Sequence, residues 1–205
     1  MNWPTATSNY RWGAPLAPVR TVAPAEAPVS LDEMKLHLHA GDDEDTLIQA
    51  YIDAATAHLD GYTGIIGRAL VTQTWQQDFS GFSHSLRLPL GPLESVSSVT
   101  YYDGSNVQQT LATSVYDKFT DALGPHVGLK PGQSWPSTYT RPDAVRVTFV
   151  AGEDVADVPA PIKVAIMLLA ANWYENRESV TLGSIPSEMP MGVAALIAPY
   201  RRVGV

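Results

Sequence analysis

The pattern of apolar and polar positions divides the chain into two helical parts with a region of strands between them. From Leu47 to Tyr62, apolar residues recur at spacings of three and four, which is typical of one buried helix face. From Arg68 to Val150, a sequence rich in Thr, Val, Tyr and Gln is interrupted by turn residues, which predicts strands joined by hairpins. Residues 164–171 then form an apolar run that covers nearly the whole circumference of a helix. We therefore predict an α+β fold, a helical bundle with an inserted antiparallel β region.

The boundaries of the elements follow from capping and turn residues. Ser30 and Glu33 have the spacing of a capping box at the start of the first helix. The third helix begins at prolines, whose missing amide donors are harmless in a first turn, and it is expected to be the central buried helix. Val71, Gln73, Trp75, Gln77 and Phe79 alternate along the first strand candidate and should share one face. We predict helices at about 30–40, 43–63, 160–178 and 191–198, and the β region at about 68–151.

Residues 1–28 are predicted to be an extended arm, and residues 29–205 a single domain. Five prolines in the arm oppose helix formation. Trp3, Tyr10 and Trp12 lie between these prolines, and such aromatic rings are expected to cover a protein surface, either of the same subunit or of a neighbour.

Composition and charge exclude several classes of function. Thirteen basic against twenty-one acidic residues give a net charge of −8, which opposes binding to nucleic-acid phosphates. Without cysteine the chain has no disulfide, thiolate metal ligand or cysteine nucleophile. It has neither a signal-peptide pattern nor the roughly 18 consecutive apolar residues that span a bilayer. We expect a protein made in the cytoplasm, without a membrane segment.

No pattern of residues assembles a catalytic, metal or cofactor site. His37 and His39 are two apart in a predicted helix and point to different faces, so they cannot both bind one ion. The acids at 42–45 are better explained by the dipole at the start of the second helix. Residues 81–85 lack the last glycine of a nucleophile elbow. Since the usual phosphate, dinucleotide and zinc motifs are also missing, we expect no enzyme and no cofactor.

The end of the third helix carries aromatic and charged side chains that could act as acids and bases. Trp173 and Arg177 are four apart and can stack, Tyr174 and Glu178 also adjoin, and an arginine in the last turn suits the helix dipole. These residues are therefore interpreted as helix-end or inter-subunit residues. They are Trp173, Tyr174, Glu175, Arg177 and Glu178.

Five segments, taken in order, resemble the head-tail connector (adaptor) proteins of tailed phages and phage-derived gene transfer agents. They are VSLDEMKLHLHAGDDEDTLIQAYIDAATAHLDGYTG, RALVTQTW, LRLPLGPLESVSSVTYYD, VPAPIKVAIMLLAANWYENRE and LIAPYRR, and they run from about Pro28 to Arg202. The resemblance implies a structural protein, one of about twelve copies in a closed ring. Such a ring lies between the portal and a stopper or other neck component of a virion or phage-like particle, which is assembled in the bacterial cytoplasm.

The resemblance also implies which residues contact the portal. In such rings the helices form the body and the C-terminal segment reaches the portal. The portal-docking residues are then Leu196, Ile197, Tyr200, Arg201 and Arg202. Deleting residues 196–205 is accordingly expected to leave a folded monomer that no longer joins heads to tails.

A ring that lets DNA pass should not bind its phosphates, so we expect an acidic channel without specific DNA binding. The first candidates to face the channel are Asp42, Asp43, Glu44 and Asp45. The alternative function is a tail or baseplate accessory module whose β region binds a ligand, such as a glycan, through Trp75, Trp135 or Tyr139.

Overall fold

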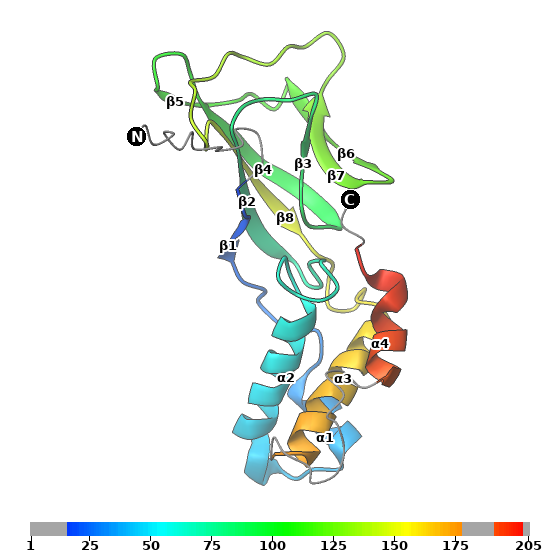
Figure 1. Ribbon diagram of the computed structural model, residues 1–205. Coiled ribbons are helices and arrows are strands. Elements are labelled where there is room, and N and C mark those ends of the chain that lie inside the picture. The colour runs from blue at the N-terminus through cyan, green and yellow to red at the C-terminus, as the bar shows by residue number, and fades with distance from the viewer. Residues whose placement is uncertain (1–15, 178–190, 203–205) are drawn as a thin grey trace, which may run out of the picture.

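Two separate hydrophobic cores divide the molecule into a helical part and a β part, which lie at opposite ends of an elongated structure (Figure 1). The computed structural model describes residues 16–177 and 191–202. The predicted α+β fold, with strands inserted between helices, is confirmed. Trp3, Tyr10, Trp12 and Glu178 lie outside the described residues.

The helical part combines elements from both ends of the chain. They are α1 (Leu31–Leu38), η1 (Asp42–Glu44), α2 (Asp45–Leu59), α3 (Ala160–Glu175), α4 (Met191–Ile197) and η2 (Ala198–Tyr200). The capping box is present, because the Ser30 hydroxyl accepts from the Glu33 amide at 3.2 Å and the Ser30 amide donates to the Glu33 carboxylate at 2.8 Å. The second helix is shorter than the predicted 43–63. Its first acids form the separate turn η1, and Asp60 leaves the helix in an extended conformation.

α3 is the central helix, since it contacts α1, α2 and α4. Its core side carries the buried residues Ile162, Ala165, Ile166, Leu169 and Ala170. The expectation of burial on all sides is wrong at Val164, which is 37% exposed on the opposite side. The helix ends at Glu175, earlier than predicted, and the Asn176 amide group donates to the carbonyl of Asn172 at 2.9 Å.

The β part consists of two antiparallel sheets that enclose the second core. The larger sheet has the order β1-β2-β8-β4-β5 and the smaller β3-β7-β6. The strands are β1 (Val19–Val22), β2 (Gln73–Phe79), β3 (Ser85–Arg87), β4 (Leu93–Tyr102), β5 (Gln108–Thr110), β6 (Tyr116–Asp121), β7 (Gly124–Leu129) and β8 (Val145–Ala151). The alternation predicted for β2 is present, because Gln73, Trp75 and Gln77 are buried and the residues between them are not.

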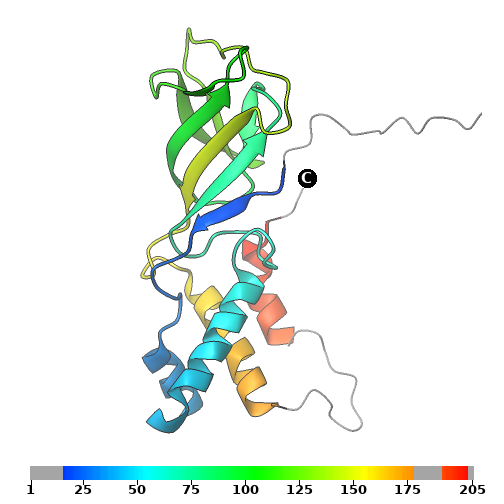
Figure 2. The ribbon, with the colours of Figure 1, turned by 90° about the vertical axis from the view of Figure 1, so that its left-hand side faces the viewer.

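The end of the proline-rich arm forms a strand that the sequence pattern did not predict. β1 pairs antiparallel with β2, with Val19 opposite Gln76 and Val22 opposite Thr74, and lies along the edge of the sheet (Figure 2). Prolines flank β1 without interrupting it, and an edge strand tolerates such neighbours. All four residues of β1 are exposed, so the strand has no alternating pattern to reveal it.

Candidate docking site

The C-terminal segment from α4 to Arg202 runs beside α3 in the helical part and ends near the β part (Figure 1). Of the residues expected to dock on a portal, Arg201 is exposed, and Leu196 and Tyr200 are half-buried against the helical core. Ile197 is only 1% exposed and belongs to that core. Its side chain therefore holds α4 on the chain's own bundle.

Arg202 joins the segment to the β part. Its guanidinium donates to the carbonyls of Leu88 at 3.2 Å, Leu123 at 3.3 Å, and Pro89, while its amide donates to the carbonyl of Ile66 at 2.8 Å. Burial, and to a lesser extent the charge of Arg87, lower the pKa of the Arg202 guanidinium. These contacts attach the end of the C-terminal segment to the β part.

The acidic segment 42–45 lies at the far end of the helical part from the strands. Lys35 binds two of its acids, Asp45 at 2.7 Å and also Asp42. Hydrogen bonds to Asp42 and then to Asp45 raise the pKa of Lys35. Asp43 is exposed and forms no ion pair with any residue in the described ranges.

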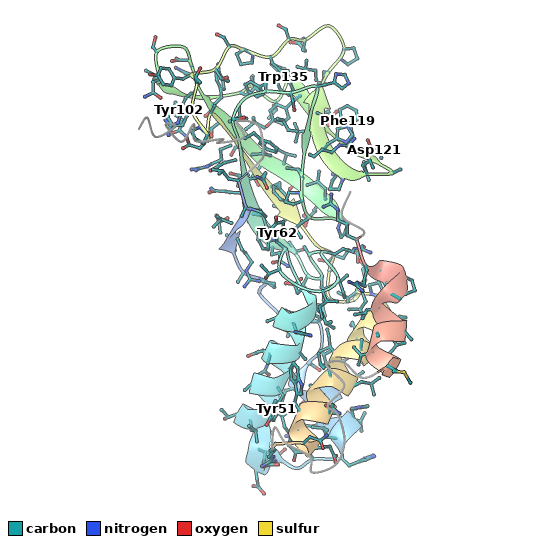
Figure 3. All side chains as sticks on the ribbon, viewed as in Figure 1. Tyr51, Tyr62, Tyr102, Phe119, Asp121 and Trp135 are labelled. Carbon is teal, nitrogen blue, oxygen red and sulfur yellow. The ribbon has the colours of Figure 1, made fainter. Side chains whose placement is uncertain are left out.

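The remaining acid, Glu44, connects this segment to the end of α3. It accepts a hydrogen bond from the Tyr174 hydroxyl and forms an ion pair with Arg177 at 2.7 Å. These two contacts, the Tyr174 bond first, lower the pKa of Glu44. Tyr174 also packs edge-on against Tyr51, with ring centroids 6.3 Å apart; Tyr51 is labelled at this end in Figure 3.

The predicted stacking of Trp173 on Arg177 is wrong. The Arg177 guanidinium lies 4.9 Å from the centre of the Tyr174 ring, whereas Trp173 packs against His58. The helix has already ended when the chain reaches Arg177, so helical spacing no longer places it beside Trp173. Glu175 is exposed. The cluster thus links the helix end to η1.

A buried carboxylate joins the two parts of the molecule at the end of α2. Asp60 is 8% exposed and accepts hydrogen bonds from the Leu70 amide at 2.7 Å and from the Gln73 side chain at 3.0 and 3.1 Å. Arg20, from β1, lies 3.7 Å away. Burial is the largest effect on the pKa of Asp60 and raises it. The sequence pattern did not indicate this residue, because its only local signal is an acid directly after an apolar helix.

The aromatic residues considered for ligand binding are mostly used in packing. Trp75 is 7% exposed within the β core. Trp135 stacks on Phe82 with ring centroids 4.6 Å apart, near the top of the β part in Figure 3. Tyr139 is 43% exposed. These three rings do not form a common open surface.

Residues 16–177 and 191–202 contain no group of three or more His, Cys, Asp or Glu side chains arranged to hold a metal ion. Within the same ranges, no helix is both long and apolar enough to cross a bilayer.

Comparison with known proteins gives a family match over part of the chain and a similar fold over most of it. The family model for phage gp6-like head-tail connector proteins matches residues 28–120. No curated protein matches the chain. Among solved structures, a chain in the neck of an empty gene transfer agent (GTA) particle, computed with C6 symmetry, is 24% identical with a TM-score of 0.73. The match covers 93% of this chain and 97% of that chain.

A second solved structure shows the same architecture. It is a chain in the neck of a native GTA particle, computed with C12 symmetry, with 23% identity and a TM-score of 0.72, over the same shares of the two chains. The similarity extends over both the helical part and the β part, because so little of either chain is left uncovered. With the family match as well, the chain is similar to head-tail connector proteins in the sequence of residues 28–120 and to these neck proteins in its fold.

Proposed function

We propose that this protein is a structural subunit of the neck of a tailed phage or gene transfer agent particle. In this role about twelve copies form a closed ring between the portal and a stopper or other neck component. The observation that carries the proposal is the fold similarity to neck proteins over 93% of the chain, together with the connector family match. A ring subunit acts through its surfaces, so the proposal assigns no catalytic residue.

We propose that the portal contact is made by the exposed side of the C-terminal segment. Arg201 is exposed, and Leu196 and Tyr200 are partly exposed beside it. Ile197 and Arg202 support the segment from within, through the core and through three carbonyls. In a protein of net charge −8, an exposed arginine at this position suits an acidic or carbonyl-rich partner surface.

Replacing Arg201 with Glu is expected to weaken binding to the portal protein of the same particle by about tenfold or more, because it reverses a charge at the contact. Arg201→Lys should retain most of the binding. Affinity is measured with purified portal rings, and the fraction of DNA-filled heads that carry tails is counted by electron microscopy. Lys130→Glu, the same charge change on the β part, is the matched control. Equal binding by Arg201→Glu and the control would contradict the proposed portal contact, and failure of the wild-type protein to bind would contradict the neck function.

The acidic segment 42–45 is proposed to face the DNA channel. Although Lys35 and Arg177 bind three of its four carboxylates, the segment keeps an excess of negative charge, with Asp43 exposed. Repeated around a ring, this charge would repel phosphates and let DNA slide without specific binding. A density map of the assembled neck is expected to place Asp43 on the inner surface. An outer position would exclude the channel role.

A further inference from the structure

A groove runs along the outer side of α2. It consists of three adjoining cavities of about 390, 520 and 640 Å³, which share Gln49 and lie between α2 and the segment 23–33. None of the described residues fills it, since the core side chains of α2 point to the other side of the helix. This groove is called here the α2 groove. Its α2 wall includes Asp45, Thr46, Gln49, Ala50, Asp53 and Ala57.

α4 presents an apolar surface without a partner in the described structure. The helix buries Val193 and Ile197 and leaves its other side open, where Met191 is 86% exposed. This exposed side, called here the α4 face, consists of Met191, Ala194 and Ala195 of α4 and of Ala198 at the start of η2. α4 has no charged residue. Covering its exposed methionine would be favoured by the hydrophobic effect.

The two surfaces lie where a closed ring requires them. α2 and α4 lie on opposite sides of α3, as Figures 1 and 2 show from two directions. Contacts that close a ring are heterologous, so each subunit uses two different surfaces on opposite sides. The alanines on both surfaces leave room for two helices to pack at a separation of about 8–10 Å.

The α2 groove is mainly acidic, whereas the α4 face carries no charge. Glu26 and Asp53 line the groove, and neither forms an ion pair with a residue that the structure describes. The α4 face lies in a segment, 191–202, that contains no acidic residue to repel the groove. Contact between two α2 grooves would bring like charges together, whereas contact between a groove and an α4 face does not.

We infer that the α4 face of one copy occupies the α2 groove of the next copy, and that this contact, repeated, closes the ring. The inference rests on the proposed ring and deepens it by naming the two surfaces that meet. The occupant of the groove is a second copy of the chain.

The test uses two variants that each block one surface. Ala50→Trp together with Ala57→Trp fills the α2 groove, and Ala195→Trp covers the α4 face; all three alanines are exposed, so the fold should persist. Wild-type protein, alone and with the portal protein of the same particle, is expected to form rings, which are detected by native mass spectrometry and electron microscopy. Each variant alone should remain monomeric. An equal mixture should give a dimer of the two variants and no ring, because one intact groove then meets one intact face.

The controls distinguish a failure of the inferred contact from a failure of the proposed ring. Ala112→Trp, exposed between β5 and β6, should form rings like the wild type. If both blocked variants still form rings, the inference is overturned and the proposed function stands. If they form rings and lose only binding to a neck protein, the groove holds a different partner, and the inference is again overturned. If wild-type protein forms no ring even with the portal protein, both the inferred contact and the proposed ring function are overturned. Unchanged thermal unfolding of the variants shows that a loss of rings is not a loss of fold.

Discussion

Replacing Ile197 with Ala is expected to lower the free energy of unfolding by about 3 kcal/mol, because the side chain is almost fully buried and its removal leaves a cavity. Ile197 lies in the helical core together with residues of α2 and α3. The free energy is measured by urea denaturation, with the slope of the transition compared between variants to show that the denatured state is unchanged.

Leu196→Ala is the matched control for this prediction. Leu196 precedes Ile197 on the same helix but is only half-buried, so its truncation is expected to cost about 1 kcal/mol. Equal losses in the free energy of unfolding for the two variants would contradict the packing of Ile197 in the helical core. A large loss of portal binding in Leu196→Ala without a large loss of stability would support the proposed docking role of its exposed part.

The core position of Ile197 changes how the docking role can be tested. Deleting residues 196–205 was expected to leave a folded monomer, but this deletion also removes Ile197 from the core and the Arg202 contacts with the β part. We now expect the truncated chain to be strongly destabilised. Substitution of Arg201 avoids this effect, because its side chain is exposed.

Replacing Asp60 with Leu is expected to destabilise the protein by about 3 kcal/mol, because it leaves the buried amide of Leu70 and the side-chain amide of Gln73 without acceptors. Asp53→Leu, on the exposed side of the same helix, should change stability by less than about 0.5 kcal/mol. Chemical denaturation of both variants at neutral pH measures the difference. A cost for Asp60→Leu as small as that of its control would show that the carboxylate does not join α2 to the strands.

The pH dependence of Asp60→Asn tests the electrostatic cost of the same residue. Burial raises the pKa of Asp60 in the folded protein, so the folded state holds the proton more tightly than the unfolded chain does. Stability from this group is therefore greatest at low pH, and it decreases as the pH rises from about 4, near the unfolded pKa, through the raised folded value. The Asp60→Asn variant has no ionisable side chain at this position. Relative to it, the wild type should become more stable as the pH falls from 7 toward 4, and an opposite trend would contradict the raised pKa.

Local sequence signals were sufficient to predict the main elements of the fold. The apolar spacing of α2, the Ser30 capping box and the alternation of Gln73, Trp75 and Gln77 each depend on residues a few positions apart. The regular geometry of a helix or strand turns such spacing directly into a buried face. The order of these segments also indicated the connector family, which the family match supports independently of the structure.

The contacts that position the proposed surfaces, in contrast, join residues that are far apart in the sequence. Arg177 reaches Glu44, Arg202 reaches Leu88, and Arg20 lies beside Asp60. β1 was missed for the same reason, because an exposed edge strand is defined by its partner β2 and by no pattern of its own.

By itself, then, the sequence determined which segments are helices and strands, that the protein is acidic and that it resembles a connector. Only the tertiary structure decided that Ile197 belongs to the core while Arg201 remains exposed, and that the α2 groove and the α4 face lie on opposite sides of the bundle. The physical reason is that burial is a property of the whole packed molecule. An apolar or charged side chain in a short C-terminal helix has the same local pattern whether it packs on its own chain or on a neighbour.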